Sequence, residues 1–293
     1  EAPLNDAFQK AGLDINLSRD HAPETVDYII FAPNGPVTDF SPYTRTKAVM
    51  SLWAGVETVV NNDTLTQPLC RLVDHSLTNG MVEWVTGHTL RHHLGMDTHI
   101  TNQDGIWREA FPPLAANRPV TILGIGALGA ACGQALHSLG FPVTGWSRSA
   151  KDIPNIRCLH GDTGLTQALT DAQIVILLLP QTPGTTNILN SDTLNLLAPG
   201  AFIINPGRGP LIDDDALLSA LNSGHIGHAT LDVFRAEPLP ADHAYWAHPN
   251  VTVTPHIAST TRPETASAII ADNISRGETG KPFRYVVDRS LGY

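Results

Sequence analysis

The stretch that decides the fold is Val120-Thr121-Ile122-Leu123-Gly124-Ile125-Gly126-Ala127-Leu128-Gly129. Its first four residues predict a short buried strand, and the small residues after Gly129 predict a helix that runs to about Leu139. The three glycines therefore stand between a strand and a helix. This is the context in which the G-x-G-x-x-G pattern indicates a dinucleotide-binding unit.

Each glycine of this loop has a separate physical task. Gly124 allows the tight turn, Gly126 lets a pyrophosphate approach the backbone, and Gly129 lets the helix pack closely on the strand. The phosphates would lie on the unpaired N–H groups of the first helical turn, which begins with Ala127 and Leu128. The loop therefore predicts a dinucleotide cofactor.

The residues after the next predicted strand indicate which dinucleotide is preferred. This strand covers residues 142–146 and is followed by Ser147, Arg148 and Lys151. Sites that prefer NAD(H) place an acidic residue about 20 positions after the glycine loop, where it binds the ribose 2′-hydroxyl. A carboxylate would repel a 2′-phosphate, whereas a hydroxyl and a guanidinium can bind it. We therefore predict that NADP(H) is preferred, with NAD(H) as a possible substitute.

The size and composition of the chain limit the classes of protein it can be. A length of 293 residues predicts two cores, and 42% hydrophobic with 16% charged residues is typical of a globular protein. The formal net charge of -10 offers no broad basic surface for nucleic acid or for an anionic membrane. The longest apolar run, residues 174–179, is far too short to cross a bilayer.

The cysteines and histidines do not form a metal-binding pattern. The cysteines are Cys70, Cys132 and Cys158. Because they are odd in number and widely spaced, we expect a reduced, cytoplasmic setting. His88 and His92 lie one turn apart in a helix predicted at residues 79–96. No Glu stands between them in the H-E-x-x-H manner, so no metal site is predicted.

The first third of the chain also alternates between helix and strand. A helix is predicted at residues 4–12, with strands at residues 13–17, 26–31 and 46–53. This alternation implies a parallel α/β sheet, where ligands gather at the carboxyl ends of the strands. The loop at Ala54 and Gly55 is therefore a candidate site. The chain opens at Glu1 in a helical pattern, which leaves open whether a strand precedes it.

Three side chains of matching chemistry follow strands of the second predicted sheet. Strands are predicted at residues 174–179, 201–205, 228–232 and 251–254. Arg208, Glu237 and His256 come after the last three of them. A guanidinium, a carboxylate and an imidazole are the groups needed to bind a small carboxylate and to protonate its neighbouring carbonyl. Each residue alone would more often be structural, but the set beside a dinucleotide site predicts catalysis.

These residues fit hydride addition to a 2-keto acid, which builds negative charge on the carbonyl oxygen. His256 suits the role of proton donor, and an ionised Glu237 beside it would favour its protonated form. Arg208 can bind a carboxylate and the adjacent oxygen together because its guanidinium is planar.

The motifs together resemble the D-isomer-specific 2-hydroxyacid dehydrogenases, and within them the glyoxylate/hydroxypyruvate reductase A group. The matching segments are Ala54-Gly55-Val56, Gly124 to Gly129, Trp146-Ser147-Arg148, Leu179-Pro180-Gln181-Thr182-Pro183, Asn205 to Arg208, Asp232 to Pro240, Thr254 to Arg262 and Val287 to Tyr293. They occur in the right order over nearly the whole chain. Such a series is far more specific than the glycine loop alone.

The resemblance implies an NADPH-preferring reductase that transfers hydride to a small 2-keto acid and gives the D-2-hydroxy acid. It implies two Rossmann-like or flavodoxin-like domains with parallel sheets and an active-site cleft between them. The substrate domain would comprise residues 1–78 and 263–293, and the dinucleotide domain residues 79–262. Family members dimerise largely through the coenzyme domains, and Trp107 resembles a dimer-contact aromatic of related reductases.

The resemblance also implies roles for individual residues. Arg208 would bind the substrate's carboxylate and carbonyl, His256 would donate the proton, and Glu237 would be its carboxylate partner. Backbone N–H groups at Ala54 and Gly55 would hold the substrate carboxylate. The expected cofactor contacts beyond the glycine loop and Ser147 to Lys151 are Leu179, Pro180, Thr185, Asn205, Pro206 and Asp232, the last facing the nicotinamide carboxamide, and Ser259 is expected at the substrate.

Other functions remain open at this point. A nucleotide-sensing binding protein on the same scaffold would bind NADP(H) without turning over a 2-keto acid. A methyltransferase could use the glycine loop for S-adenosylmethionine, although Arg148 and the proton-transfer set disfavour this. NAD-dependent D-2-hydroxyacid dehydrogenases of other substrate choice are near relatives. The sequence leaves the preferred 2-keto acid and the direction of the reaction undecided.

Overall fold

A computed structural model describes residues 1–290 and residue 292, and the chain divides into two compact units. One unit combines Glu1–Leu77 with Thr260–Tyr293, and the other is Thr78–Ser259. Leu291 and Tyr293, which belong to the closing motif and to the predicted segment 263–293, lie outside the described residues. Each unit contains a parallel sheet, so the predicted α/β class is confirmed.

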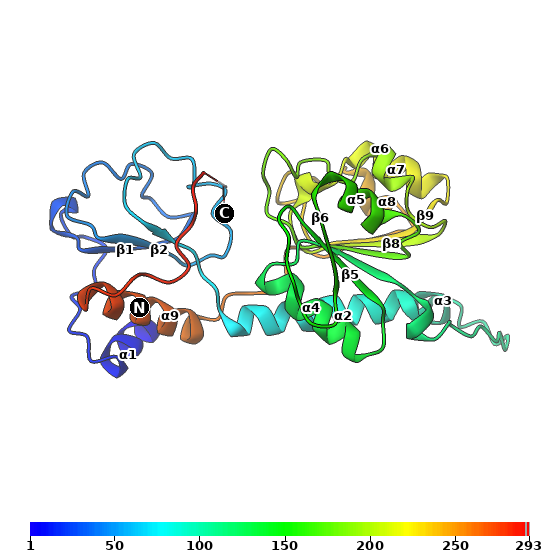
Figure 1. Ribbon diagram of the computed structural model, residues 1–293, viewed down its shortest axis with the longest axis horizontal. Coiled ribbons are helices and arrows are strands. Elements are labelled where there is room, and N and C mark those ends of the chain that lie inside the picture. Colours follow the sequence, from blue (N-terminus) through cyan, green and yellow to red (C-terminus); the bar gives the residue numbers. More distant parts are fainter. Residues whose placement is uncertain (291, 293) are drawn as a thin grey trace. The chain divides into compact units, whose positions relative to one another are not determined.

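The first unit is built on a three-stranded parallel sheet in the order β1-β2-β3 (Figure 1). The strands are β1 (Tyr28–Phe31), β2 (Ala48–Ser51) and β3 (Leu69–Cys70), with a 3-10 turn η1 (Pro23–Thr25) before β1. Helices α1 (Ala2–Lys10) and α9 (Pro263–Glu278) pack together below this sheet in Figure 1. Phe8, Ile270 and Ile274 are buried there against Ala48 and Met50, so both ends of the chain share one core.

The strand predicted at residues 13–17 is wrong. Leu13, Ile15 and Leu17 are partly buried against the cluster that contains Phe8, but this segment is not hydrogen-bonded into the sheet of its unit. Every second residue of this segment is apolar because that side of the segment packs on the core, and not because the segment is a strand of the sheet. The strand predicted at residues 46–53 does form, over the shorter range of β2.

The second unit contains a seven-stranded parallel sheet in the order β10-β9-β8-β7-β4-β5-β6. Its strands are β4 (Val120–Leu123), β5 (Val143–Ser147), β6 (Arg157–His160), β7 (Ile174–Leu177), β8 (Ala201–Asn205), β9 (Ile226–Leu231) and β10 (Val251–Val253). The strand order reverses between β4 and β7, and ligands of doubly wound sheets bind at the carboxyl ends beside such a reversal. Strand β6 was not predicted, because Arg157 and His160 are exposed and only its two middle residues are partly buried.

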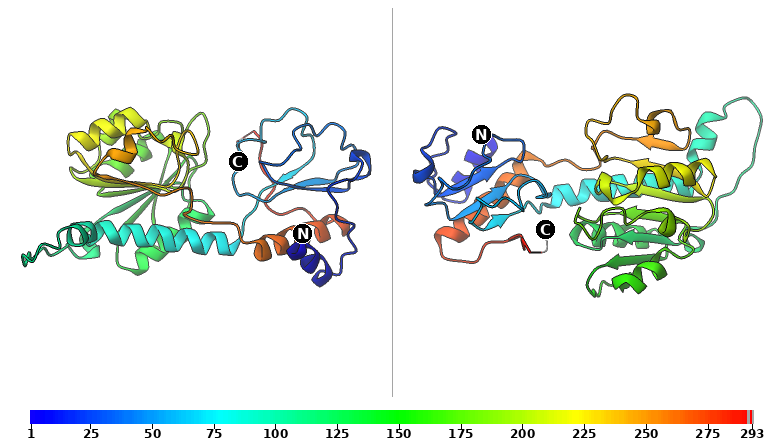
Figure 2. Two further views of the ribbon diagram at one scale, coloured as in Figure 1. Left: turned by 180° about the vertical axis from the view of Figure 1, so that it is seen from behind. Right: turned by 90° about the horizontal axis from the view of Figure 1, so that it is seen from above.

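Helices cover both faces of this sheet (Figures 1 and 2). On one face, α2 (His75–His93) and α4 (Ala127–Ser138) bury Val85 and Leu136 against Ile122, Ile176 and Ile204. The opposite face is covered by α5 (Gly161–Leu169), α6 (Ser191–Leu194) and α7 (Asp214–Asn222). The remaining short elements are α3 (Met96–Thr101), η2 (Ala115–Asn117), η3 (Gly209–Leu211) and α8 (Ala244–Ala247).

Helix α2 begins at His75 and ends at His93, so both of its ends lie earlier in the chain than those of the predicted helix at residues 79–96. The carboxylate of Asp74 accepts hydrogen bonds from the N–H of Ser76 at 3.1 Å and from its hydroxyl at 2.7 Å, and so caps the first turn. The chain leaves the helix after His93 and passes through Gly95, whose φ is 63°. Among the described residues, no helix combines the length and the apolar character that a membrane span requires.

One buried and one partly buried histidine link α2 to strands β8, β9 and β10 of the second sheet. His92 stacks on Phe202, with ring centroids 4.8 Å apart, and its Nε2 lies 2.9 Å from the Thr230 hydroxyl. His228 lies 5.1 Å from His92 between ring centroids, and its Nε2 is 2.8 Å from the Thr252 hydroxyl. Burial lowers the pKa of His92 to about 3 and that of His228 to about 4. Both imidazoles are therefore neutral in the folded protein near neutral pH.

These histidines predict a loss of folding stability in mild acid. In the unfolded chain an imidazole gains its proton below about pH 6.5, whereas His92 resists protonation until the pH falls toward the lowered pKa of the folded state. The contribution of neutral His92 to the free energy of unfolding is therefore complete above about pH 6.5 and is lost as the pH falls. We expect the melting temperature to fall between pH 7 and pH 5 by about 4 °C more in the wild type than in His92→Phe. Parallel pH profiles for the two proteins, measured by calorimetry, would contradict this account.

Candidate active site

The turn after β8 presents Arg208 at the carboxyl edge of the second sheet. The side chain of Asn205, which is 1% exposed, accepts the N–H of Gly207 at 3.1 Å and donates to the carbonyl of Arg208 at 3.0 Å. The guanidinium of Arg208 donates to the Gly207 carbonyl at 2.7 Å and is partly buried. Asn205, a predicted cofactor contact, thus folds the turn that carries the predicted substrate-binding arginine.

The loops after β9 and β10 bring Glu237 and His256 into contact. Nδ1 of His256 lies 2.7 Å from Oε2 of Glu237, and the two side chains are 52% and 35% exposed. The second oxygen of Glu237 accepts the N–H of Phe234 at 2.8 Å, which fixes the carboxylate. Because Nδ1 is held by Glu237, the Nε2 atom on the other side of the imidazole ring points away from it. His256 can therefore present Nε2 to a reacting oxygen.

Asp232 holds the segment that carries His256. Its carboxylate is completely buried and accepts the hydroxyl of Thr254 at 2.6 Å and the N–H groups of Ile257 and Ala258 at 2.8 Å each. The N–H of His256 donates to the Asp232 carbonyl at 2.8 Å. His256 adopts a φ of 54°, a left-handed conformation that is unusual for a residue with a side chain. The expected contact between Asp232 and the nicotinamide stays a prediction.

The loops after β8 and β9 also touch each other. A Cβ atom added to Gly209 would lie 2.0 Å from the carbonyl carbon of Phe234 and 2.4 Å from the N atom of Arg235. A side chain at position 209 is therefore excluded, and the two backbones pack directly against each other. This contact places the turn of Arg208 beside the loop of Glu237.

The glycine loop has the geometry that a dinucleotide pyrophosphate needs. A Cβ on Gly124, where φ is 102°, would lie 2.6 Å from the Leu178 carbonyl, and one on Gly129 would lie 1.9 Å from the Gly124 carbonyl oxygen. A Cβ on Gly126 would meet no atom within 4 Å, so this position faces open space. Helix α4 starts without a side-chain cap and without an acidic residue in its first turn, at Ala127 and Leu128. Its N–H groups are thus available to an anion.

The remaining predicted cofactor residues lie at the same edge of the sheet. Ser147 ends β5, which is the neighbour of β4, and its hydroxyl donates to the Ser149 carbonyl at 2.8 Å. Arg148 and Lys151 follow and are exposed. Leu179 and Pro180 follow β7, and Pro206 follows β8. The hydroxyl of Thr185 donates to the Pro180 carbonyl at 2.7 Å, so Thr185 stabilises its own loop.

The predicted substrate contacts are distributed over both units. Ser259 lies at the end of the second unit, and a Cβ on Gly80 of α2 would come within 2.8 Å of its hydroxyl. Ala54 and Gly55 lie in the first unit, in the loop after β2, and are partly buried. The hydroxyl of Ser51 donates to the Trp53 carbonyl at 3.0 Å and accepts the Trp53 N–H at 3.1 Å, which shapes this loop.

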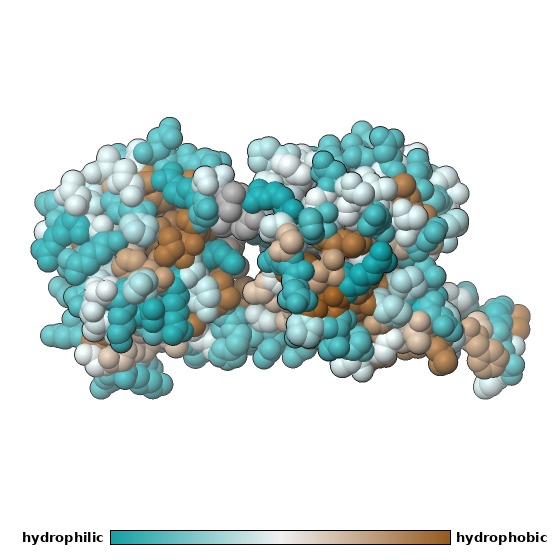
Figure 3. Space-filling model, in the orientation of Figure 1, coloured by the Kyte–Doolittle hydropathy of each residue, from teal (hydrophilic) through white to brown (hydrophobic). Residues whose placement is uncertain are grey.

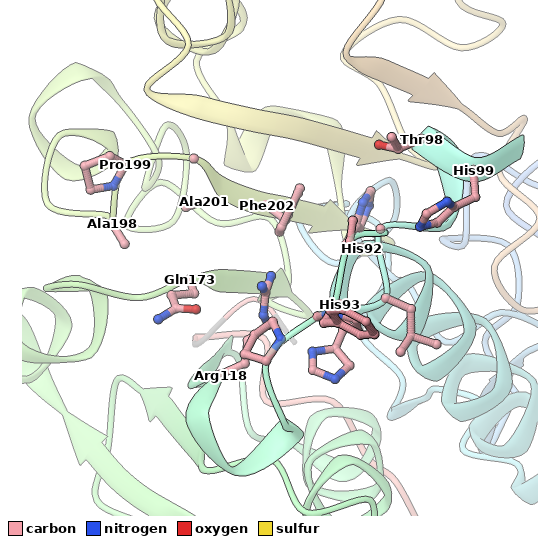
Figure 4. Close-up of a pocket in the computed structure, with 17 residues that line it drawn as sticks. His92, His93, Thr98, His99, Arg118, Gln173, Ala198, Pro199, Ala201 and Phe202 are labelled. Carbon is pink, nitrogen blue, oxygen red and sulfur yellow. The ribbon is translucent and has the colours of Figure 1, made fainter. Parts of the chain in front are cut away.

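A cavity of about 490 Å³ lies elsewhere in the second unit (Figure 4). It is lined by His92, His93, Arg118 and Phe202 among others, and none of its lining residues is Asp or Glu. Phe202 belongs to the first residues of β8, at the amino end of the strand, whereas Arg208 follows the carboxyl end. The cavity is therefore separate from the predicted catalytic set. No group of three or more His, Cys, Asp or Glu side chains among the described residues could hold a metal ion.

Two contributors to the site were not predicted from the sequence. The N–H of Phe234 fixes Glu237, and the hydroxyl of Thr254 supports Asp232. A backbone N–H carries no side-chain signal, because every residue except proline has one. Thr254 stands two residues before His256, but only the fold shows that it points at a carboxylate.

Comparison with known families gives a match over most of the second unit. Residues 86–258 match the family described as D-isomer specific 2-hydroxyacid dehydrogenase, NAD binding domain. The chain is 41% identical over 257 residues to a glyoxylate/hydroxypyruvate reductase A from Serratia proteamaculans, covering 85% of this chain and 82% of that protein. A reductase of the same name from Yersinia enterocolitica is 38% identical over 255 residues, covering 84% and 82%.

Solved structures show the same architecture. A D-isomer specific 2-hydroxyacid dehydrogenase from Xanthobacter autotrophicus in complex with NADPH and MES matches with a TM-score of 0.92 and 40% identity, covering 100% of this chain and 96% of that one. An NADPH-dependent glyoxylate/hydroxypyruvate reductase from Sinorhizobium meliloti in complex with NADP and sulfate matches with a TM-score of 0.90 and 32% identity, with the same coverage.

Proposed function

Because this chain belongs to the D-isomer specific 2-hydroxyacid dehydrogenase family, we propose that it is an NADPH-dependent reductase of small 2-keto acids such as glyoxylate and hydroxypyruvate. The product would be the D-2-hydroxy acid. The observation that carries this proposal is the hydrogen-bonded pair of Glu237 and His256 at the sheet edge that also bears the glycine loop and Arg208. The names of the Serratia and Sinorhizobium relatives support the substrate class.

The choice of cofactor is supported by residues and by relatives. Ser147 and Arg148 stand at the position where NAD-preferring sites have an acidic residue, which would repel a 2′-phosphate. The Xanthobacter structure is in complex with NADPH and the Sinorhizobium structure with NADP. We assign the pyrophosphate to the N–H groups at Gly126 to Gly129 and the 2′-phosphate to Ser147, Arg148 and Lys151. Leu179, Pro180, Thr185, Asn205, Pro206 and Asp232 would border the nicotinamide half.

The proposed mechanism uses the three catalytic side chains in separate roles. Bound NADPH supplies the hydride. Arg208 binds the carboxylate of the keto acid and the adjacent carbonyl oxygen, which orients the carbonyl and stabilises its growing negative charge. His256 donates a proton from Nε2 to that oxygen, while Glu237 at Nδ1 fixes the ring and stabilises its charged form.

We further propose that the unit Thr78–Ser259 binds the dinucleotide and that Glu1–Leu77 with Thr260–Tyr293 binds the substrate. The glycine loop and the catalytic set belong to the former, and the candidate N–H groups at Ala54 and Gly55 to the latter. Ser259 would also face the substrate. A cytoplasmic location is supported by three cysteines that are all free, and fractionation of cells tests it.

We propose that the protein forms a homodimer through an exposed apolar segment, residues 100–114, called the arm below. Five large apolar side chains on the arm are exposed: Ile100 at 69%, Ile106 at 63%, Trp107 at 89%, Phe111 at 85% and Leu114 at 75%. Figure 3 shows apolar residues on the segment that extends beyond α3. An apolar group of this size on a surface favours coverage by a partner, and a second copy is the partner that dimerisation in this family implies.

Removing apolar area from the arm is expected to weaken this association. The double variant Trp107→Ser, Phe111→Ser should sediment as a monomer at micromolar concentration, where the wild type sediments as a dimer. Trp246→Ser is a matched control, because Trp246 is 52% exposed on α8, outside the arm. A monomeric wild type, or a double variant that stays dimeric, would refute the proposed role of the arm.

Steady-state kinetics with glyoxylate, hydroxypyruvate, phenylpyruvate and pyruvate, each with NADPH and with NADH, test the function. We expect turnover of glyoxylate or hydroxypyruvate, with kcat/KM for NADPH at least about 10-fold above that for NADH, because Arg148 can bind the 2′-phosphate. A better kcat/KM with NADH would overturn the cofactor assignment. Tight binding of NADPH with negligible turnover of every keto acid would favour a nucleotide-sensing protein.

A further inference from the structure

Three loops at the carboxyl edge of the second sheet carry the proposed site residues. Thr185 lies in the loop after β7, Arg208 in the loop after β8, and Glu237 in the loop after β9. Catalysis requires these groups to keep their relative positions within a fraction of an ångström. Backbone contacts join these loops in pairs, between Gly209 and Phe234 and between Leu189 and Leu211, but they do not fix the side chains. Arg235, two residues before Glu237, lies at the point where they meet.

The guanidinium of Arg235 contacts each of the neighbouring segments. Nη2 donates to the side-chain oxygen of Asn187 in the loop after β7, and to the carbonyl of Ile212 in the loop after β8. Nε lies 3.2 Å from Oδ2 of Asp214, in the first turn of α7. The other oxygen of Asp214 accepts the hydroxyl of Tyr245 at 2.8 Å, so the carboxylate is itself fixed.

The position of Arg235 is transmitted to Glu237 through a short backbone segment. Phe234 precedes Arg235 and donates its N–H to Oε1 of Glu237. The residue is 9% exposed, and its ring centroid lies 6.4 Å from that of Tyr245. The contacts of its guanidinium fix the position of Arg235. They therefore also fix the N–H of the neighbouring Phe234, which orients the Glu237 carboxylate. Glu237 in turn contacts Nδ1 of His256 at 2.7 Å.

We propose that Arg235 is a positioning residue for the reduction, which cross-links the three loops and keeps Glu237 aligned on His256. This inference rests on the proposed function of the site. The planar guanidinium meets acceptors on three segments at once, and a lysine ammonium at the same place could not reach all three. The side chains of Arg235 and Asp214 are 37% and 27% exposed, so solvent screens the ion pair. The geometry of the contacts therefore matters more than the charge.

Kinetics of Arg235 variants test the proposal. Arg235→Ala should lower kcat by about 10-fold and leave KM for NADPH within about two-fold, because the loops lose alignment while the glycine loop is unchanged. Arg235→Lys should recover only part of the loss, since it keeps the contact with Asp214 alone. Asp214→Asn, a milder change that keeps the shape of the side chain, should lower kcat by about three-fold. Arg157→Ala, at an exposed position at the start of β6, is the matched control and should behave as wild type.

A double-mutant cycle separates positioning from general damage to the fold. In the Glu237→Gln background, Arg235→Ala should change kcat by less than about two-fold, because the carboxylate it positions is already absent. An equal loss in both backgrounds, or an Arg235→Ala enzyme as fast as wild type, would overturn the proposal. A wild type that reduces no 2-keto acid would overturn the proposed function and this inference with it. An active wild type whose Arg235 variants behave otherwise than expected would overturn this inference alone.

Discussion

The His256→Ala variant is expected to lose at least about 100-fold in kcat for the reduction of glyoxylate or hydroxypyruvate, which corresponds to about 2.7 kcal/mol of barrier height. Removing the imidazole removes the proton donor, and a water molecule in its place is a much weaker acid that nothing orients. Because the N–H of residue 256 would still donate to the Asp232 carbonyl, the loop should persist and NADPH should bind as before.

Single-turnover and steady-state kinetics with saturating NADPH measure this loss directly. His137→Ala is a suitable control, because His137 is an exposed histidine at the end of α4, at the opposite edge of the sheet from His256. Activity of His256→Ala within a few-fold of wild type would reject the assignment of His256 as general acid. A loss in NADPH affinity of the same size would instead indicate damage to the cofactor site.

The second large effect is expected for Arg208→Lys. Lysine keeps the charge but cannot bind a carboxylate and the adjacent carbonyl oxygen in one plane, and it cannot reproduce the contact from the guanidinium to the Gly207 carbonyl. One charge-assisted hydrogen bond of about 1.5–3 kcal/mol would be lost in the transition state, so kcat/KM should fall by about 10- to 100-fold.

The cofactor kinetics provide the internal check on this prediction. KM for NADPH should remain near the wild-type value, because the glycine loop and Ser147 do not contact the keto acid in the proposed site. Arg157→Lys makes the same chemical change at an exposed position and should have no effect. Full activity of Arg208→Lys would show that two-point binding of the substrate is incorrect.

Much of the second sheet could be predicted from the sequence because its buried strands are short apolar runs. Strands β4 and β8 were placed correctly, and the glycines after β4 identified the turn into α4. Strand β6 escaped prediction because Arg157 and His160 at its ends are exposed and polar. The false strand at residues 13–17 shows the converse, since apolar alternation records burial and does not by itself record pairing.

The site was predictable in its residue types and less so in its contacts. Glu237 and His256 follow successive predicted strands, and the family resemblance implied that they are partners; in the structure they lie 2.7 Å apart. The contacts of Arg235 with Asn187, 48 residues away, depend on how two loops fold over the edge, and no local pattern records this. The expected contact of Asp232 with the cofactor stays a prediction, and no local pattern indicated that its carboxylate accepts the hydroxyl and N–H groups that follow β10.

The absence of a side chain at position 209 has a consequence for how the enzyme meets its substrate. With the backbone of Gly209 pressed against Phe234, the turn that carries Arg208 and the loop that carries Glu237 are in direct backbone contact. The conformational entropy of bringing these groups together is therefore lost once, during folding, and not again in each catalytic cycle.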